Sequence, residues 1–175
     1  MSPYKLLFIF VEGNDDERFF NRILSPKLQE KYDTVMIIKY ATMEKEKVNE
    51  FIKSIKAMGA EYIYVTDIDN SPCVTAKKEK IQKKHPNIGK DKIIVVIKEI
   101  ESWYLAGLDN EVCKQLKIYN FTNTDNVTKE EFNDMIIKKF TSRIDSMLEI
   151  LKNFSIEIAK RKNNSFRYFV ENHDC

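Results

Sequence analysis

The sequence is poor in the residues that mark several common classes of protein. Its 175 residues include only four Gly and four Pro, so a long disordered linker is not expected. Its three cysteines, Cys73, Cys113 and Cys175, are far apart and form no Cys-x-x-Cys pair. Neither a zinc ribbon nor a disulfide framework is therefore expected. The net charge of +2 is too small to indicate a polyanionic partner by itself.

Long apolar runs are also missing. No segment is apolar over the length needed to span a bilayer. The apolar stretch near the N-terminus lacks the small-residue cleavage site of a secretory leader. Hydrophobic residues make up 43% of the chain and charged residues 32%, as in a soluble globular domain. We therefore expect no membrane association, and a reducing cytoplasm as the compartment.

Strand and helix patterns alternate over the first hundred residues. Apolar, β-branched or aromatic runs predict strands at 4–10, 34–40, 62–66 and 92–97. Helical spacing of apolar residues predicts helices that begin near residue 14, at 44–58 and at 74–84. Such alternation is typical of a parallel sheet with right-handed crossovers and helices on both faces.

The rest of the chain has helical patterns only, at 100–106, 110–116, 129–140, 142–158 and 159–171. We therefore predict an α/β, Rossmann-like core over residues 1–108, with a mostly parallel four-stranded sheet between helices. Residues 109–175 are expected to add a C-terminal helical region that packs on this core within a single domain.

Acidic residues follow several of the predicted strands. Glu12 comes after the first strand, Asp67 and Asp69 after the third, and Glu99 and Glu101 after the fourth. The carboxyl ends of parallel strands share one edge, where neighbouring strands are about 4.8 Å apart. Carboxylates brought together there repel one another unless a cation compensates their charge. A hard divalent ion such as Mg²⁺ (or Mn²⁺) is the natural choice, since it prefers oxygen ligands.

Simpler structural explanations exist for most of these acids. Asp15, Asp16 and Glu17 are ordinary residues for a first helical turn, which Asn14 or Asp15 is expected to cap. Gly13 is expected to supply an unusual backbone conformation between strand and helix. Asp67-Ile68-Asp69-Asn70 followed by Ser-Pro is also a common turn sequence.

The pairing of Glu12-Gly13 with Asp67-Ile68-Asp69 resembles the Toprim family of topoisomerases, bacterial primases, small RNA maturases and overcoming-lysogenization-defect nucleases. Asp16 matches a further acid of the nuclease branch. The segment from Glu101 to Ala106 and the tail Asn164-Ser165-Phe166-Arg167-Tyr168-Phe169 resemble elements of small stand-alone Toprim-like proteins. Two positions depart from the pattern. Asp15 replaces a small hydroxyl residue, and Gly107 stands where an Asp is frequent, so that Asp109 is a possible substitute.

The resemblance implies metal-dependent cleavage of phosphodiester bonds in DNA or RNA, and a link to phage defence. It implies that Asp67 and Asp69 hold Mg²⁺ and that Glu12 is a ligand or the general base. Asp16 and Glu101 would then hold a second ion. No Gly-x-x-x-x-Gly-Lys-Ser/Thr motif occurs, so any ATPase partner is expected to be a separate chain.

Basic residues form two clusters that could contact nucleic acid. The first lies in the predicted helix at 74–84 and includes Lys77, Lys78, Lys83 and Lys84. The second includes Lys162 and Arg167, either of which could neutralise charge in a transition state. A solvated helix face is the more usual explanation of such runs, and Trp103, Tyr104 and Leu105 fit a helix core better than a base-stacking platform.

Three hypotheses follow from the sequence. The first is a Mg²⁺-dependent nuclease or phosphodiesterase of Toprim type. The second is a non-catalytic module of the same fold that binds nucleic acid or a partner protein. The third is a receiver-like phosphoacceptor, against which the acid pair beyond Gly13 and the lack of a lysine after a fifth strand both count.

Overall fold

The computed structural model describes residues 3–136 and 140–175. The chain divides into two compact units, one that extends to Val95 and one from Val96 to Asp174. The division falls after Val95, whereas the sequence pattern placed the change near residue 108. The helix that begins at Glu101 therefore belongs to the second unit.

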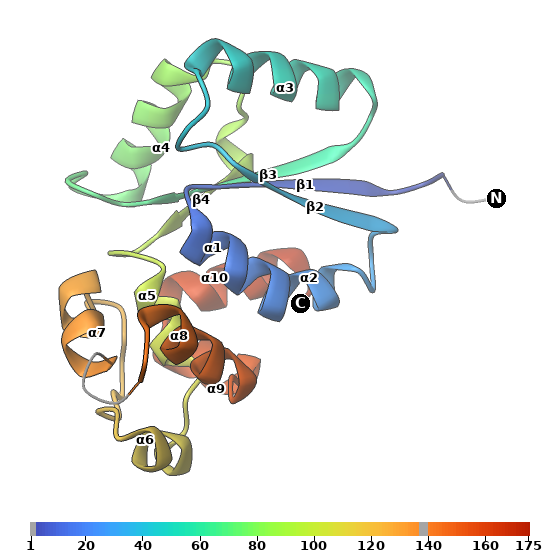
Figure 1. Cartoon of the computed structure of the whole chain (residues 1–175). Helices are drawn as coiled ribbons and strands as arrows, with labels where there is room; N and C mark the ends of the chain where they lie inside the picture. The colour runs from blue at the N-terminus through green and yellow to red at the C-terminus, as the bar shows by residue number, and fades with distance from the viewer. Residues whose placement is uncertain (1–2, 137–139) are drawn as a thin grey trace. The chain divides into compact units, whose positions relative to one another are not determined.

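The first unit is built on a four-stranded parallel sheet with the strand order β2-β1-β3-β4 (Figure 1). The strands are β1 (Leu6–Val11), β2 (Thr34–Lys39), β3 (Glu61–Asp67) and β4 (Ile93–Val96). In the register, Phe10 pairs with Ile38 on one side and with Tyr64 on the other. This confirms the predicted α/β class with a parallel four-stranded sheet, and it puts β1 and β3 at the centre.

Helices cover both faces of this sheet, with α3 and α4 on one face and α1 and α2 on the other (Figure 1). Their bounds are α1 (Asn14–Phe19), α2 (Ser25–Leu28), α3 (Lys45–Ala57) and α4 (Val74–Lys84). A π-helical turn, η1 (Phe20–Leu24), joins α1 to α2, and a 3₁₀ turn, η2 (Lys90–Lys92), precedes β4. The helix predicted to begin near residue 14 is thus a continuous helical segment from Asn14 to Leu28 that contains a π turn.

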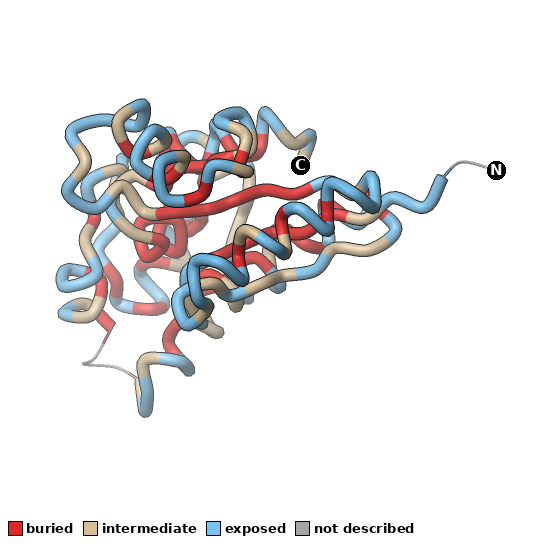
Figure 2. The backbone as a smooth tube through the Cα atoms, turned by 90° about the horizontal axis from the view of Figure 1, so that it is seen from above, coloured by how far each residue is buried: buried red, intermediate tan, exposed pale blue. Residues whose placement is uncertain are grey.

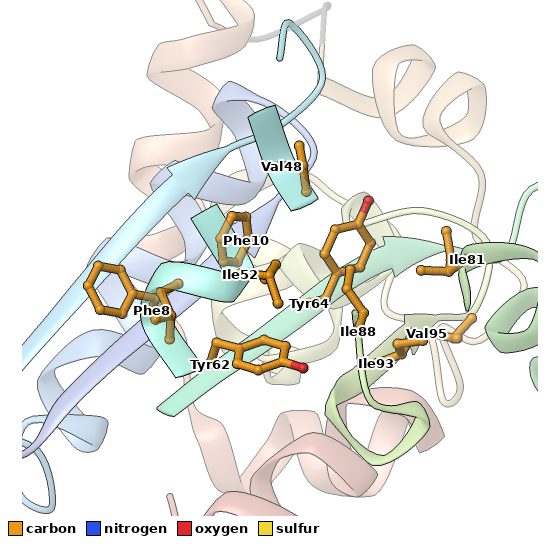
Figure 3. Close-up of a cluster of buried hydrophobic side chains, with 11 residues drawn as sticks. Phe8, Phe10, Val48, Ile52, Tyr62, Tyr64, Ile81, Ile88, Ile93 and Val95 are labelled. Carbon is orange, nitrogen blue, oxygen red and sulfur yellow. The ribbon is translucent and has the colours of Figure 1, made fainter. Parts of the chain in front are cut away.

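A hydrophobic core lies between the sheet and helices α3 and α4. Every second residue of the central strands contributes its side chain to this core. Phe8 and Phe10 of β1 and Tyr62 and Tyr64 of β3 point into this core (Figure 3). Ile52 of α3 packs against them and is fully buried. Each such side chain stabilises the fold by about 1.5–3 kcal/mol relative to an exposed one. The C-terminus of α3 is set by Gly59, whose φ of 68° is readily available only to glycine.

The second unit is helical. It contains α5 (Glu101–Ala106), α6 (Asn110–Leu116), α7 (Lys129–Ile136), α8 (Arg143–Lys152), α9 (Ile156–Lys162) and α10 (Asn164–His173). Buried and exposed positions alternate along α7, α8 and α10, as expected for amphipathic segments, whereas every residue of α5 is buried. Figure 2 shows how buried and exposed stretches alternate along the described chain. The helix predicted at 142–158 is wrong as a single element, because the Ser155 hydroxyl accepts from the Ile158 N–H and caps a new helix. The predicted helix at 129–140 is described to Ile136, and residues 137–139 lie outside the described part of the chain.

His85 makes the stability of the first unit sensitive to pH. Its side chain is 1% exposed, and its Nδ1 lies 3.2 Å from the Asn49 Oδ1. Burial lowers the pKa of His85, nearby Lys84 and Lys45 act in the same direction, and Glu46 opposes them. The unfolded chain takes up a proton below about pH 6.5, whereas the folded protein resists it. Stability should therefore fall as the pH falls below about 6.5.

Urea unfolding at about pH 7.5 and about pH 5.5 measures this effect, and His85→Gln is the comparison variant. The loss of stability on acidification should be smaller in His85→Gln than in the wild type, since both carry the same carboxylates. An equal loss in the two proteins would show that His85 does not contribute to the pH dependence.

Candidate active site at the carboxyl edge of the sheet

Glu12 and Asp67 lie at the ends of the two central strands. Glu12 follows β1 directly and is exposed, while Asp67 is the last residue of β3 and is half-buried. Continuing the parallel register beyond the Phe10–Tyr64 pair by two residues brings Glu12 level with Thr66, next to Asp67. The carboxyl edge of a parallel sheet is where α/β proteins bind ligands. The structure thus brings these two acids to neighbouring strand ends.

The turn after Glu12 differs from the expected one. Gly13, and not Asn14 or Asp15, is the N-cap of α1, and its N–H donates to the Asp16 carboxylate at 3.2 Å. Gly13 has an extended backbone with a φ of −148°, so the expected need for a special glycine conformation is wrong. A Cβ at Gly13 would meet no atom within 4 Å. The space beside Gly13, the residue that follows Glu12, is therefore open.

The acids of the α1 first turn have local partners. The Asp15 carboxylate forms an ion pair with Arg18 at 2.7 Å, and Glu17 forms one with Lys39 at 3.0 Å. Asp16 is 7% exposed, and its carboxylate holds the start of the helix. For Asp15, Asp16 and Glu17, the structural explanation given by the sequence pattern accounts for the contacts that the structure shows.

Glu12 acts electrostatically on two stacked tyrosines, Tyr40 and Tyr64. The rings of Tyr40 and Tyr64 stack at 4.5 Å, and the Tyr40 hydroxyl donates to the Val65 carbonyl at 2.8 Å. Burial raises the pKa of Tyr40 well above its usual value, and the charges of Tyr64 and Glu12 add to the effect. Burial also raises the pKa of Tyr64 to about 12, with a further contribution from Glu12. Both phenols therefore stay protonated at neutral pH, within electrostatic range of the Glu12 carboxylate.

Asp69 is held by a lysine from the next helix. It lies in a turn that the Ser71 N–H closes on the Ile68 carbonyl at 3.1 Å, and its φ of 47° is left-handed. The Lys77 ammonium forms an ion pair with the Asp69 carboxylate. The Lys77 side chain is 4% exposed, whereas that of Asp69 is 56% exposed. The Asp-x-Asp segment is thus a turn, as one interpretation of the sequence proposed, and it also places a buried cation beside the acidic edge.

Sequence reasoning grouped Lys77 with the surface lysines and missed this role. A signal was present in the spacing, since Lys77 is four residues before Ile81 and both are buried on the inner side of α4. A lysine on an apolar helix face needs an anion within reach of its ammonium. Asp69, eight residues earlier, meets that need.

The other basic residues of α4 that were predicted to contact nucleic acid differ in their exposure to solvent. Lys83 and Lys84 are exposed in the last turn of α4, where a phosphate backbone can reach them. Burial lowers the pKa of Lys78, Lys90 acts in the same direction, and Asp91 opposes both. Lys78 is therefore half-buried beside other charges.

In the second unit, Lys162 and Arg167 have structural contacts. The Lys162 ammonium donates to the Leu108 carbonyl at 2.6 Å and to the Asn120 Oδ1 at 2.8 Å. Burial lowers its pKa, which the charges of Cys113 and Asp109 oppose. Arg167 is exposed and donates to the Asn164 Oδ1 at 2.6 Å. Lys162 thus ties loops of the second unit together.

Glu101 belongs to the second unit and forms an ion pair there. Its side chain is 3% exposed, and its Oε1 lies 2.6 Å from an Arg143 nitrogen. The same guanidinium donates to the Asn133 Oδ1 at 2.7 Å and lies 5.6 Å from the centre of the Phe132 ring. Glu101 therefore joins α5 to α8 and the end of α7. A role in binding a second ion stays a prediction.

The two outer motifs of the Toprim resemblance meet in the core of the second unit. The Trp103 indole N–H donates to the Ser165 hydroxyl at 2.8 Å, and the Trp103 and Phe166 rings are 5.2 Å apart. The Asn163 side chain donates to the Ser102 hydroxyl at 3.4 Å. Trp103 is fully buried, which confirms that it is a core residue and not an exposed stacking platform.

The departure at Gly107 has a steric reason. A Cβ at this position would lie 2.3 Å from a ring carbon of Phe154, so only glycine fits without a shift of that ring. Asp109, the suggested substitute acid, is the N-cap of α6 and accepts from the Val112 N–H at 2.8 Å. The contact seen for Asp109 is therefore that of a helix cap.

The acidic edge offers the type of ligand that Mg²⁺ prefers, although no dense cluster is present. Among residues 3–136 and 140–175, no group of three His, Cys, Asp or Glu side chains is close enough to hold an ion. Mg²⁺ keeps several waters and is often held by one or two carboxylates together with substrate phosphates. Glu12, exposed beside open space, and Asp67 on the next strand fit such a water-rich site better than a fully protein-built cage.

No family model, no curated protein and no solved structure matches this chain. The resemblance to the Toprim family therefore depends on the motifs in the sequence itself. Within the described residues, none of the helices has both the length and the apolar character to cross a bilayer.

Proposed function

We propose that this protein is a Toprim-like, Mg²⁺-dependent phosphodiesterase of the cytoplasm that acts on DNA or RNA, alone or together with a separate ATPase chain. The observation that carries the proposal is the position of Glu12 and Asp67 at the ends of the adjacent parallel strands β1 and β3. The open space beside Gly13 leaves room for a substrate at that position.

In this proposal Glu12 and Asp67 hold the ion, and Asp69 completes the acidic set on the other side of the turn. A bound Mg²⁺ supplies an activated water and offsets the charge that develops on the phosphate. In the alternative role, Glu12 is the general base that accepts a proton from this water, a role that its exposure at the edge supports. The phenols of Tyr40 and Tyr64, which lie within electrostatic range of Glu12, stay neutral and add no charge of their own to the edge.

A second candidate is a binding module of the same fold without catalytic activity. Two ion pairs favour it, Asp69 with Lys77 and Glu101 with Arg143. In these pairs the negative charges of two of the five predicted metal ligands are balanced by basic side chains of the protein itself. Such a protein would bind nucleic acid or a partner chain and would not cleave it.

Cleavage assays separate the two candidates. Plasmid and single-stranded RNA, incubated with the wild-type protein and Mg²⁺ or Mn²⁺, should be cut in the presence of metal and preserved by a chelator. Binding without cleavage under all these conditions, and also in the presence of a candidate ATPase partner, would support the binding module and contradict the phosphodiesterase.

Asp67→Asn should abolish metal binding without loss of the fold. The side chain is half-buried at the end of β3, and removing its charge relieves repulsion with Glu12 in the metal-free protein. We expect the stability of the metal-free variant to be within about 0.5 kcal/mol of the wild type. Thermal unfolding with increasing Mn²⁺ should show a rising midpoint for the wild type and little change for the variant. A large loss of stability without metal would instead make Asp67 a structural residue of the turn.

A further inference from the structure

Lys77 brings a positive charge to the acidic edge from inside the protein. Its side chain is 4% exposed and is paired with Asp69, whose carboxylate is largely in contact with solvent. A buried ammonium must keep an anion nearby, because an unpaired buried charge is strongly destabilising. Asp69 therefore has two possible cationic partners. It balances the charge of Lys77, and it is also one of the acids of the candidate metal site.

Continuing the side-chain alternation of β1 by one step beyond Phe10 puts Glu12 on the sheet face that α4, the helix of Lys77, covers. Helix α4, which carries Lys77, covers the face to which Tyr64 contributes, and the Glu12 charge acts on the Tyr64 hydroxyl (Figures 1 and 3). A divalent ion at Glu12 and Asp67 would thus lie near the ammonium and compete with it for Asp69. Repulsion between the two cations lowers the affinity for the ion.

A phosphate group reverses this balance. Its anionic oxygens attract both the ion and the ammonium, so each cation favours the binding of the phosphate. By thermodynamic linkage, the phosphate must then favour the binding of the ion to the same extent. Lysine suits such an exchange of partners, because its ammonium is a compact point charge with donors that can rotate.

We propose that Lys77 is a phosphate-binding residue that couples metal binding to substrate binding. In the ligand-free protein its ammonium holds Asp69, and it moves to a phosphate oxygen when a divalent ion and a phosphodiester bind together. This inference rests on the proposed function, since it takes Glu12 and Asp67 as the ligands of the ion. Its consequence is a site with low affinity for free Mg²⁺ that is completed by the substrate.

Calorimetric titration of Mg²⁺ into Lys77→Met, without phosphate, is the first test. Methionine keeps the length and the apolar stem of the side chain, so the buried space stays filled. Lys77→Met should bind Mg²⁺ about tenfold more tightly than the wild type, within the usual range for coupled sites. Lys80→Met, an exposed position of the same helix, is the matched control and should bind Mg²⁺ like the wild type.

The second test uses inorganic phosphate, which cannot be cleaved further, as the probe. The wild type should bind phosphate about tenfold more tightly with saturating Mg²⁺ than without it, and Lys77→Met should lose most of this gain. Asp69→Asn is the complementary variant should Lys77→Met not fold. It leaves the ammonium without its carboxylate, so the affinity for phosphate without metal should rise and that for Mg²⁺ should fall.

The outcomes distinguish this inference from the function on which it rests. If the wild type binds Mg²⁺, Asp67→Asn does not, and Lys77→Met behaves like the wild type in both titrations, the coupling role of Lys77 is refuted and the metal site stands. If neither the wild type nor Lys77→Met binds Mg²⁺, with or without phosphate, both the metal site and the coupling are refuted.

Discussion

Glu12→Gln should reduce metal-dependent cleavage by a factor of about one hundred or more, the usual size of a general-base or ligand contribution. Glutamine keeps the shape of the side chain and its capacity for hydrogen bonds but lacks the negative charge. Glu12 is exposed, so the substitution should leave the fold unchanged. The initial rate of oligonucleotide cleavage with Mn²⁺, at matched protein concentration, measures the effect.

Glu17→Gln is the control for this prediction. It removes a negative charge only five positions away, but that carboxylate is paired with Lys39 at 3.0 Å and lies within helix α1. Its rate should be within about twofold of the wild type, since a partly exposed ion pair contributes little. A Glu12→Gln variant that cleaves as fast as Glu17→Gln would remove Glu12 from the site, although the fold would be unaffected.

The second large effect is structural. Trp103→Ala should destabilise the protein by about 3–5 kcal/mol, because it leaves a cavity where a fully buried indole was packed. Trp103→Phe keeps a ring beside Phe166 but loses the hydrogen bond to the Ser165 hydroxyl. It leaves that hydroxyl with fewer partners and should cost about 1 kcal/mol of hydrogen bonding in addition to a smaller loss of packing.

Chemical denaturation followed by circular dichroism measures both Trp103 variants. Ile144→Ala, an exposed position of α8 in the same unit, is the control and should change stability by no more than about 0.5 kcal/mol. If Trp103→Ala were as stable as the wild type but failed to bind single-stranded nucleic acid, the indole would be a binding residue and the assignment to the core would be wrong.

The charged contacts show most clearly where sequence reasoning reaches its limit. Asp69 pairs with Lys77 eight residues away, and Glu101 pairs with Arg143 at a separation of 42 residues. Neither pair has a distinctive local motif, because a charged side chain accepts any partner of opposite sign that packing brings near it. The same holds for the contact of Trp103 with Ser165, which joins motifs 62 residues apart.

Sequence patterns were enough to predict the parallel α/β sheet, the ends of its four strands to within two residues, and the position of Glu12 and Asp67 at one edge. These follow from local physics, since side-chain periodicity defines each element and parallel strands must end together. Which acids form ion pairs within the protein, as Asp69 does with Lys77 and Glu101 with Arg143, follows from tertiary packing. That choice depends on which helix faces each strand end, and no short stretch of sequence encodes it. Lys77 is the clearest case, because a residue that belongs to a basic run in the sequence is a buried counter-charge in the fold.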